Sequence, residues 1–429
     1  MSMKSHFQIA LFLALLAVKQ AARVAINKIE VLLDDTITAN DSTFGTPIGE
    51  FYIVQLADPQ LGMLKMAEKT KKAAKDFSAE KDNLKHAVTS ILKLRPPPAA
   101  VVMSGDMQNF WSKRGANNLK LSDLGSDYGN FQAISVKLAM AKLEKENIPV
   151  KYTPGNHDLD DVVDMEVLNR YKNLWGDDSG ASVYGDYYSF QIENVFFMSI
   201  NSQMYFSQNH EQPVIEHEQA QTAWIRSTLS EWQGIENPPS AIVILTHIPP
   251  FIGSYGEQSG WANWETSFKE EILGLFYGTT GFKKVPELWL CGHFHGNAHA
   301  YHRMNNWPID VVTTGSVGTT MLWNGSYVPA PNFYGSEHAS TIAKAVSGGA
   351  AFVKHIHGGS ADNVKARLST SKDLSGLRVV QFYTNGQYRH KWFTLNEFER
   401  VSKRGTIDAE VMSGSEISYS AHLAQQRTK

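Results

Sequence analysis

The stretch from Val150 to Asp158 reads VKYTPGNHD, a short strand-like run that leads into Asn156, His157 and Asp158. An amide, an imidazole and a carboxylate at consecutive positions can bind a metal ion or move a proton. One such stretch proves little, because polar residues often follow a strand simply as turn formers. Its weight comes from four other stretches that are built in the same way.

These four stretches are also strand-like runs that end in side chains able to bind a metal. They read FYIVQLADPQ at 51–60, AAVVMSGD at 99–106, AIVILTH at 241–247 and LWLCGHFH at 288–295. Most of the runs have the length and the β-branched or aromatic content of buried strands. In layered α/β proteins, binding sites form beyond the carboxyl ends of strands. We therefore expect the five endings to meet in one place.

The polar residues at these endings, taken singly, have ordinary structural explanations. A lone His247 is more often a satisfied core histidine than a ligand, and Asp106 after a glycine is a common turn. His293 and His295 are a sharper signal, because the i, i+2 spacing places both on one face of an extended chain. The joint occurrence of all five endings, each after a strand, predicts the metal site.

Oxygen and imidazole ligands in one site suit a binuclear centre of Mn, Fe or Zn. Two ions about 3.5–4 Å apart can generate a hydroxide and clamp both oxygens of an in-line displacement at phosphorus. Asp106 is the expected bridging carboxylate. The single cysteine, Cys291, excludes an intrachain disulfide and a thiolate zinc cluster.

The overall composition is that of a globular protein. The 429 residues carry 40 Lys and Arg against 43 Asp and Glu, a net charge of −3, and 42% are hydrophobic. This balance excludes wholesale disorder. Because the chain has no overall basic field, nucleic acid is not expected as its main partner.

Residues 1–46 are expected to form a leader and linker. An apolar stretch from Ile9 to Val18 follows Lys4 and His6, which is the order of a signal peptide or anchor. The stretch is shorter than a membrane span, and a short helix packed on the domain is the alternative. The leader favours the secretory pathway or an extracellular location, with membrane association through this stretch alone.

One catalytic domain is expected from residue 47 to about 400. A stretch rich in Gly, Ser and Ala near 323–375 is expected to be an insertion, and 401–429 a polar tail. Helical spacing predicts a helix from Asp76 to Leu94. An Asn-Gly turn at 385–386 predicts a hairpin between strands at 377–382 and 388–395.

The order D-x-(H/Q), GD, GNHD, H and GHxH resembles the motif set of the calcineurin-like metallophosphoesterases. Further motifs resemble one branch of them, the calcineurin-like phosphoesterase domain-containing serine/threonine protein phosphatases. These motifs are Asp58-Pro59-Gln60, Trp175-Gly176-Asp177-Asp178, Asn201-Ser202-Gln203, His247-Ile248-Pro249 and Gly376-Leu377-Arg378-Val379-Val380. The similarity runs from about Tyr52 to about Phe398 but not through 323–375. It implies an α+β fold in four layers (α/β/β/α), with two packed mixed β-sheets flanked by helices, and a cytoplasmic location.

The resemblance also implies roles for individual residues around two divalent metal ions. The first ion would be held by Asp58, Gln60, Asp106 and His295, and the second by Asp106, Asn156, His247 and His293. His157 would contact the phosphate and protonate the leaving oxygen. Asp158 would fix the tautomer of that imidazole and raise its pKa.

Two departures from the wider superfamily are visible. Gln60 stands where most members have His, and a neutral amide oxygen favours Mn or Mg over Zn at the first position. The resembling branch shares this glutamine. Gly105-Asp106-Met107-Gln108 also lacks the Asp-Arg-Gly continuation of the major phosphoprotein phosphatases, so no arginine clamp for phosphate can be carried over.

Two loops are candidate substrate walls, Trp111–Asn130 and Phe251–Ser267. The aromatic residues of the second loop suit packing as well as recognition; they include Tyr255, Trp261 and Trp264. Three histidines of the insertion are better explained as solvated loop residues than as another metal site; they are His338, His355 and His357.

Together, these features predict a metal-dependent phosphohydrolase, either a phosphoprotein (Ser/Thr) phosphatase or a phosphomonoester phosphatase. One alternative is a phosphodiesterase that acts on nucleotides or lipid head groups. Another is a non-catalytic metal-binding interaction module, against which the complete ligand set and His157 argue.

Overall fold

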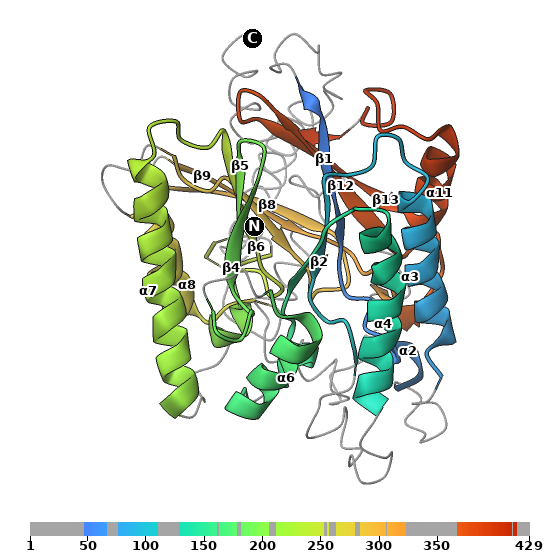
Figure 1. Ribbon diagram of the computed structural model, residues 1–429, viewed down its shortest axis with the longest axis horizontal. Helices are drawn as coiled ribbons and strands as arrows, with labels where there is room; N and C mark the ends of the chain where they lie inside the picture. The colour runs from blue at the N-terminus through green and yellow to red at the C-terminus, as the bar shows by residue number, and fades with distance from the viewer. Residues whose placement is uncertain are drawn as a thin grey trace, which may run out of the picture.

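The chain folds into two six-stranded mixed β-sheets with helices outside them, as the computed structural model shows (Figure 1). The structure describes residues 47–66, 76–109, 128–160, 163–177, 182–205, 212–252, 255–256, 263–278, 284–305, 307–322, 367–413 and 415–417.

The first sheet has the strand order β14-β13-β12-β1-β2-β3. Its strands are β1 (Pro47–Leu56), β2 (Ala100–Ser104), β3 (Val150–Thr153), β12 (Gly376–Tyr383), β13 (Tyr388–Thr394) and β14 (Glu416–Ile417). β1, β2 and β3 are parallel, with Ile53 opposite Ala100 and Val101 opposite Val150. β12 lies antiparallel to β1 on its other side. The three parallel strands therefore end at the same edge of the sheet.

The second sheet has the order β4-β5-β6-β7-β9-β8. Its strands are β4 (Tyr188–Ile192), β5 (Val195–Ser199), β6 (Ala241–Leu245), β7 (Leu288–Cys291), β8 (Ala298–Met304) and β9 (Trp307–Thr313). The four central strands, β5, β6, β7 and β9, are parallel. The edge strands β4 and β8 are antiparallel to their neighbours.

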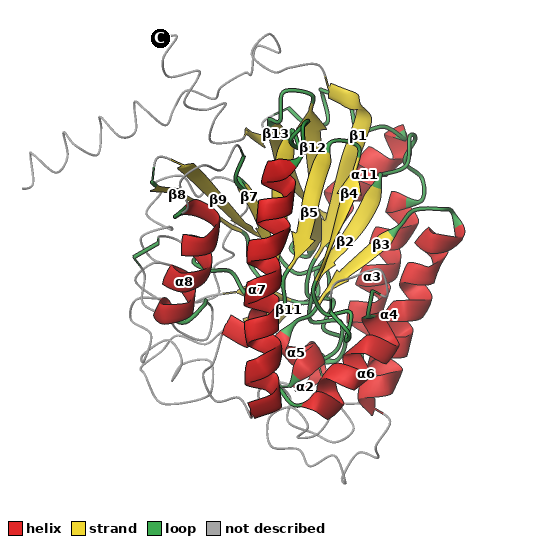
Figure 2. Cartoon of the chain, turned by 60° about the vertical axis from the view of Figure 1, so that its left-hand side comes forward, coloured by secondary structure: helices red, strands yellow, loops and turns green. Residues whose placement is uncertain are grey.

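Helices cover the outer face of each sheet (Figure 2). Helices α3 (Ser78–Ile91), α4 (Tyr128–Lys145) and α11 (Leu395–Arg404) lie on the first sheet, and α7 (Gln212–Gly234) and α8 (Thr266–Tyr277) lie on the second. Short elements lie near the strand ends: α2 (Met63–Met66), α5 (Asn156–Leu159), the longer α6 (Met165–Trp175) and the 3-10 turn η5 (Ser202–Tyr205). This arrangement confirms the four-layer α/β/β/α fold that the resemblance implies.

The core shows why the strand runs are apolar on both faces. Phe51 and Ile53 of β1 point between the sheets, whereas Tyr52 and Val54 point outward against the helices, as the two-residue period of a strand requires. Between the sheets, Phe197 of the second sheet packs edge-on against the ring of Phe382 from the first, with ring centroids 5.9 Å apart. Strands covered on both faces have no polar side, which explains the continuous apolar runs along the chain.

The helix and the hairpin predicted from local patterns are both present. The predicted helix from Asp76 to Leu94 is α3, whose first turn is held by the side chain of Asp76 accepting from the amide of Ser78 at 3.1 Å. The predicted hairpin is β12–β13, with Phe382 opposite Tyr388 around the Asn-Gly turn.

The proposed insertion leaves and rejoins the domain at paired strands. β10 (Thr320–Leu322) pairs antiparallel with β11 (Arg367–Ser369), so the two ends of the intervening segment lie side by side. Residues 323–366, with the three histidines, lie outside the described residues. Residues after 369 already pack on the domain, since the side chain of Asn83 donates to the carbonyl of Thr370 at 2.9 Å. Residues 367–375 of the stretch predicted to be an insertion therefore pack on the domain.

The domain also continues past residue 400, where a polar tail was expected. Helix α11 runs to Arg404, the side chains of Val411 and Met412 are buried, and β14 adds an edge strand to β13. An amphipathic helix and a strand of two residues are polar in average composition, which is why the tail looks unstructured in sequence. Residues 418–429 lie outside the described residues.

The apolar stretch from Ile9 to Val18 also lies outside the described residues, so targeting through it stays a prediction. Within the described ranges, no helix combines the length and the apolar character needed to cross a membrane.

Candidate active site

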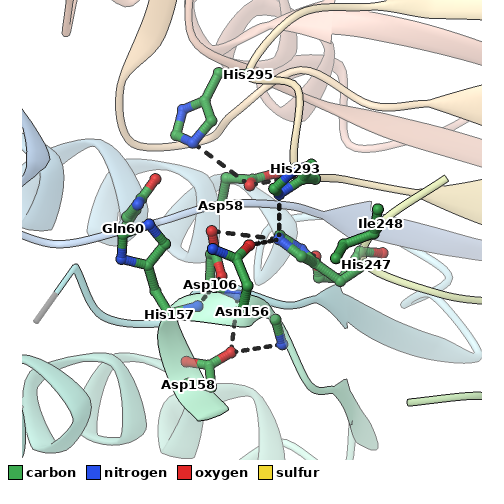
Figure 3. Close-up of polar contacts among 12 residues, drawn as sticks. Asp58, Gln60, Asp106, Asn156, His157, Asp158, His247, Ile248, His293 and His295 are labelled. Carbon is green, nitrogen blue, oxygen red and sulfur yellow. Dashed lines mark hydrogen bonds and ion pairs between the residues drawn. The ribbon is translucent and has the colours of Figure 1, made fainter. Parts of the chain in front are cut away.

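The five predicted strand endings meet at one edge of the two sheets (Figure 3). The seven candidate ligands there form what we call the strand-end cluster: Asp58, Gln60, Asp106, Asn156, His247, His293 and His295. They follow β1, β2, β3, β6 and β7, and all are buried except the half-buried Asn156. His157 is half-buried too. The solvent side of the cluster is therefore the side of Asn156 and His157.

The backbone of the cluster is held in unusual conformations. Five of the seven residues have a positive φ: Asp58 (49°), Gln60 (31°), Asp106 (52°), His293 (72°) and His295 (54°). For a non-glycine residue such a conformation costs on the order of 1–3 kcal/mol and is concentrated at functional sites. Hydrogen bonds between the loops fix it, among them the amide of Gln60 donating to the carbonyl of Asp106 at 2.8 Å.

Two motif glycines allow the strand ends to approach one another. A Cβ atom on Gly155 would lie 2.2 Å from Oδ1 of Asp106, and one on Gly105 would lie 2.5 Å from Nδ1 of His247. Neither space admits a side chain. The glycines of the GD and GNHD motifs are thus needed to bring β2, β3 and β6 together at the cluster.

One part of the cluster gathers lone pairs around the ring of His247. Its Nδ1 lies 2.7 Å from the carbonyl of Ser104, which can only accept, so Nδ1 carries the proton and donates. Nε2 then faces Oδ1 of Asn156 at 3.1 Å, Nδ1 of His293 at 3.2 Å and Oδ2 of Asp106 at 3.3 Å. Acceptor atoms from three side chains therefore point at Nε2 of a fourth.

The other part of the cluster is built on the same plan around His295. Its Nδ1 donates to the carbonyl of Thr319 at 2.6 Å, and its Nε2 faces Oδ1 of Asp58 at 3.5 Å. Ligand atoms of Asp58, Asp106 and His295 lie within 4.8 Å of one another. Oε1 of Gln60 is buried and has no hydrogen-bond partner among the described residues. Asp106 also belongs to a group with His247 and His293, so it is shared by both parts.

The electrostatics of the strand-end cluster favour a bound positive charge. Burial raises the pKa of Asp58 well above its usual value. Burial opposes protonation of His247, but the charges of Asp106 and Asp58, together with hydrogen bonds to Asp106 and to the carbonyl of Ser104, outweigh it and raise the pKa of His247 to about 9. Burial lowers the pKa of His295 to about 4, which keeps its Nε2 lone pair available. A proton on His247 or a bound cation would each relieve the crowded acceptors.

His157 lies beside the cluster but is held by a different group from the one expected. Its Nδ1 lies 2.8 Å from the carbonyl of Asn109, and its amide donates to Oδ1 of Asp106 at 2.9 Å. The prediction that Asp158 would orient this imidazole is wrong. Adjacent residues on a helical turn point about 100° apart, and Asp158 points back toward Gly155.

Asp158 instead ties two motif loops together. Oδ2 accepts from the amides of Asp106 and Gly155 at 2.8 and 2.9 Å, and Oδ1 accepts from the amide of Met107 at 3.0 Å. Burial, followed by the charge of Asp106, raises the pKa of this carboxyl to about 7. Asp158 therefore supports the backbone around Asp106 and does not touch the ring of His157.

Sequence reasoning missed the residues just after Asp106. The side chain of Asn109 accepts from Nε2 of Gln60 at 3.1 Å, and the main-chain amide of Asn109 donates to Oε1 of Gln132 at 3.0 Å. Gln108 donates from Nε2 to the carbonyl of His157 at 3.3 Å. No sequence signal marks these contacts, because several of them use main-chain atoms that every residue has.

The candidate substrate walls are only partly described. Residues 110–127 and Trp261 lie outside the described residues. Trp264 is fully buried, and its indole donates to the carbonyl of Ile248 at 2.7 Å, so it serves packing. The ring of Tyr255 stacks on that of His302, with centroids 4.4 Å apart.

A second buried group of His and Asp lies between the two sheets, and we call it the inter-sheet cluster. It comprises His299 of β8, Asp310 of β9, Arg378 of β12, and Tyr388 and His390 of β13. Ligand atoms of His299, Asp310 and His390 lie within 4.8 Å of one another. Nε2 of His299 contacts Oδ1 of Asp310, and the hydroxyl of Tyr388 donates to Oδ2 at 2.7 Å. Arg378 donates from Nη1 to Nδ1 of His390 at 2.7 Å.

Comparison with known proteins identifies the family. The calcineurin-like phosphoesterase family matches residues 51–297, more than half of the chain. Serine/threonine-protein phosphatase CPPED1 of Danio rerio is 27% identical over 272 residues, covering 63% of this chain and 77% of that protein. CPPED1 of Homo sapiens is 26% identical over 273 residues, covering 63% and 76%.

Solved structures align with this chain at lower similarity. GAP50, the anchor in the inner membrane complex of Plasmodium, aligns with a TM-score of 0.42 at 13% identity, covering 81% of this chain and 85% of that one. Purple acid phosphatase PPD1 from yellow lupin (Lupinus luteus) seeds aligns at 0.40 and 10%, covering 81% and 52%. From the match of the family over residues 51–297, the chain belongs to the calcineurin-like phosphoesterases and is a hydrolase that acts on phosphate esters.

Proposed function

We propose that this chain is a phosphomonoester phosphatase that acts on phosphorylated serine or threonine of proteins and uses two divalent metal ions. The observation that carries the proposal is the strand-end cluster: two groups of buried acceptor atoms that share Asp106. Acceptor atoms packed 3.1 to 3.3 Å apart repel unless a cation or a proton lies between them.

The donor set suits metal ions on chemical grounds. Main-chain carbonyls accept hydrogen bonds from Nδ1 of His247 and of His295. Both Nε2 lone pairs are therefore directed inward, as in metal sites of other proteins. The oxygen of Gln60, which has no partner among the described residues, adds a neutral ligand. Asp58, Gln60, Asp106 and His295 would hold the first ion. Asp106, Asn156, His247 and His293 would hold the second.

The chain's own residues have separate tasks in phosphate-ester hydrolysis. When bound, the two ions supply Lewis acidity at phosphorus and lower the pKa of a water molecule. His157, next to the ligand Asn156 and on the solvent side, donates a proton from Nε2 to the leaving oxygen. The carbonyl of Asn109 keeps the Nδ1 proton in place, so Nε2 is the nitrogen that exchanges protons with substrate.

We propose the identity of the metals from the chemistry of their ligands. An amide oxygen at Gln60 is harder and weaker than imidazole, which favours Mn or Mg at the first position, with Mn, Fe or Zn at the second. Gln60→His should keep activity and shift the preference toward Zn. Activity measured against Mn, Mg and Zn after chelator treatment tests this, and an unchanged preference would contradict the role of Gln60.

The substrate class rests on the relatives, which are named serine/threonine-protein phosphatases. The test is metal analysis of the purified chain combined with rates on a phosphoserine peptide, p-nitrophenyl phosphate, a nucleotide and bis(p-nitrophenyl) phosphate. We expect bound Mn, Fe or Zn and faster hydrolysis of monoesters. Faster hydrolysis of the diester would favour the phosphodiesterase alternative. Bound metal with no turnover of any substrate would favour an interaction module.

A further inference from the structure

We propose that Asn109 is a positioning residue that holds the amide of Gln60 with its oxygen, and not its nitrogen, facing the first metal position. This inference rests on the proposed function, because it takes Gln60 as a ligand. It concerns a difficulty that the usual histidine at this position does not have.

A glutamine ligand has two ends of nearly the same size. Its oxygen binds a cation, whereas its NH₂ group repels one. A buried amide can turn over unless a neighbour distinguishes the two ends. Gln60 is 2% exposed, so neither end of its amide faces bulk solvent.

Asn109 is the neighbour in contact with Gln60, and it presents the oxygen of its own amide. Oδ1 of Asn109 accepts from Nε2 of Gln60 at 3.1 Å, in a contact between two buried side chains. The Gln60 oxygen then has no hydrogen-bond partner among the described residues. Figure 3 shows that this oxygen lies on the side of Gln60 that faces His295 and Asp58. A buried, unpartnered acceptor directed at a metal position is what a ligand awaiting a cation requires.

The main chain of Asn109 is fixed independently of its side chain. Its amide donates to Oε1 of Gln132 on α4, and its carbonyl accepts from Nδ1 of His157. Asn109 therefore serves Gln60 with its side chain and His157 with its carbonyl. A substitution of Asn109 removes the side-chain contact with Gln60 and keeps the main-chain carbonyl that accepts from His157. The effects on Gln60 and on His157 can therefore be measured separately.

The experiment is a four-member cycle: wild type, Asn109→Leu, Gln60→His and the double variant. Equilibrium dialysis of the full chain against Mn²⁺, with bound metal counted by mass spectrometry, gives the affinity of each of two binding steps. Asn109→Leu should weaken one step by about 10- to 100-fold, the range for loss of a residue that orients a ligand. In the Gln60→His background the same substitution should have a smaller effect, because an imidazole can move its proton between the two ring nitrogens and still present a lone pair to the ion.

Two further variants sharpen the result. Asn109→Asp offers only acceptor atoms, so it should retain at least wild-type affinity for Mn²⁺. Gln381→Leu removes another buried amide of the first sheet, one that accepts from Nε of Arg389 at 3.0 Å, and should leave both steps unchanged. Asn109→Ala takes the place of Asn109→Leu if the leucine chain does not fold.

The rate ratio between phosphoserine peptide and p-nitrophenyl phosphate, at saturating Mn²⁺, separates positioning from general loosening. Asn109→Leu should leave this ratio unchanged, because the carbonyl that holds His157 remains. An equal loss of affinity in the wild-type and Gln60→His backgrounds, or a changed ratio, would overturn the positioning role. If Gln60→Leu itself leaves both affinities unchanged, the ligand assignment in the proposed function fails instead.

Discussion

The strand-end cluster and the inter-sheet cluster contain the same kinds of residue, buried His and Asp within reach of a common point, but they are suited to different tasks. The difference lies in the groups that hydrogen-bond to Nδ1 of the histidine rings. In the strand-end cluster, carbonyls of Ser104 and Thr319 accept the Nδ1 protons of His247 and His295. In the inter-sheet cluster, Arg378 donates to Nδ1 of His390.

The group behind the ring decides which nitrogen carries the proton. A guanidinium can only donate, so Nδ1 of neutral His390 must be the acceptor and Nε2 carries the hydrogen. That Nε2 has no hydrogen-bond partner among the described residues. A ring whose Nδ1 accepts from a guanidinium and whose Nε2 carries a hydrogen has no free lone pair for a metal ion, whereas the inward lone pairs of the strand-end cluster attract one. A count of His and Asp alone would not separate the two sites.

The largest expected difference between the clusters is the effect of removing one carboxylate. Asp106→Asn should reduce turnover of p-nitrophenyl phosphate to the level of chelator-treated wild type and lower the metal bound per chain. The physical reason is that Asp106 is shared by both parts of the strand-end cluster, so both would lose the same charge. Steady-state rates and metal analysis check it. Wild-type turnover by Asp106→Asn would contradict the shared site.

The next effect concerns His157, which lies beside the strand-end cluster without being one of its proposed ligands. Proton donation to a poor leaving group is worth about 10²–10⁴-fold in rate. His157→Ala should lose a factor of that order on a phosphoserine peptide, whose alkoxide needs a proton, and much less on p-nitrophenyl phosphate. Bound metal should stay unchanged. Equal losses on both substrates at metal saturation would mean that His157 only positions phosphate.

The positions of the strand-end residues could be predicted because each follows a strand that is recognisable on its own. Parallel strands bring such endings to one edge of a sheet, so local patterns sufficed to group Asp58 with Asp106 and His247 with His293. That the two edges meet depends on how the two sheets stack. The contacts that each side chain makes were harder to predict. Asp158 was expected beside His157, but the rotation of a helical turn sends it to three main-chain amides.

Other features had no local signal at all. The carbonyl of Asn109 acts on His157 through an atom that does not depend on residue type. The inter-sheet cluster joins His299, Asp310 and His390 from three strands. No sequence pattern around these residues predicts that they lie together. Contacts of that kind follow from how the two sheets stack, which pattern reasoning along one chain does not determine.

A smaller effect is expected when the carboxylate of the inter-sheet cluster is changed. Asp310 contacts His299 through Oδ1 and accepts from the hydroxyl of Tyr388 through Oδ2. Asp310→Asn keeps the shape but weakens these charge-assisted bonds, and it should lower the free energy of unfolding by about 1–3 kcal/mol. Urea denaturation checks this. Turnover and bound metal should match wild type, and a loss of bound metal would show that the inter-sheet cluster holds an ion.

The smallest effect is a change in how stability depends on pH. Burial, followed by the charges of Arg378 and His299, holds the pKa of His390 well below its ordinary value of 6.5. Among the described residues, Asp310 and Tyr388 are further titratable groups beside it. Below pH 6.5 the unfolded chain therefore binds a proton at this position that the folded chain does not, so stability falls as pH decreases.

His390→Gln removes that proton uptake while an amide oxygen can still accept from Arg378. Between about pH 7 and pH 5 the free energy of unfolding of wild type should fall more steeply than that of the variant, by at most about 1.4 kcal/mol per pH unit. The carboxylates are the same in both chains, so their titration cancels in the difference between the two urea-denaturation series. Parallel pH profiles would mean that His390 is protonated in the folded chain or makes no net contribution. Repeating the series with added Zn²⁺ extends the comparison. The difference should not change, because Nδ1 of His390 accepts from Arg378 and its Nε2 carries a hydrogen, whereas an ion bound through His390 would stabilise wild type more than the variant.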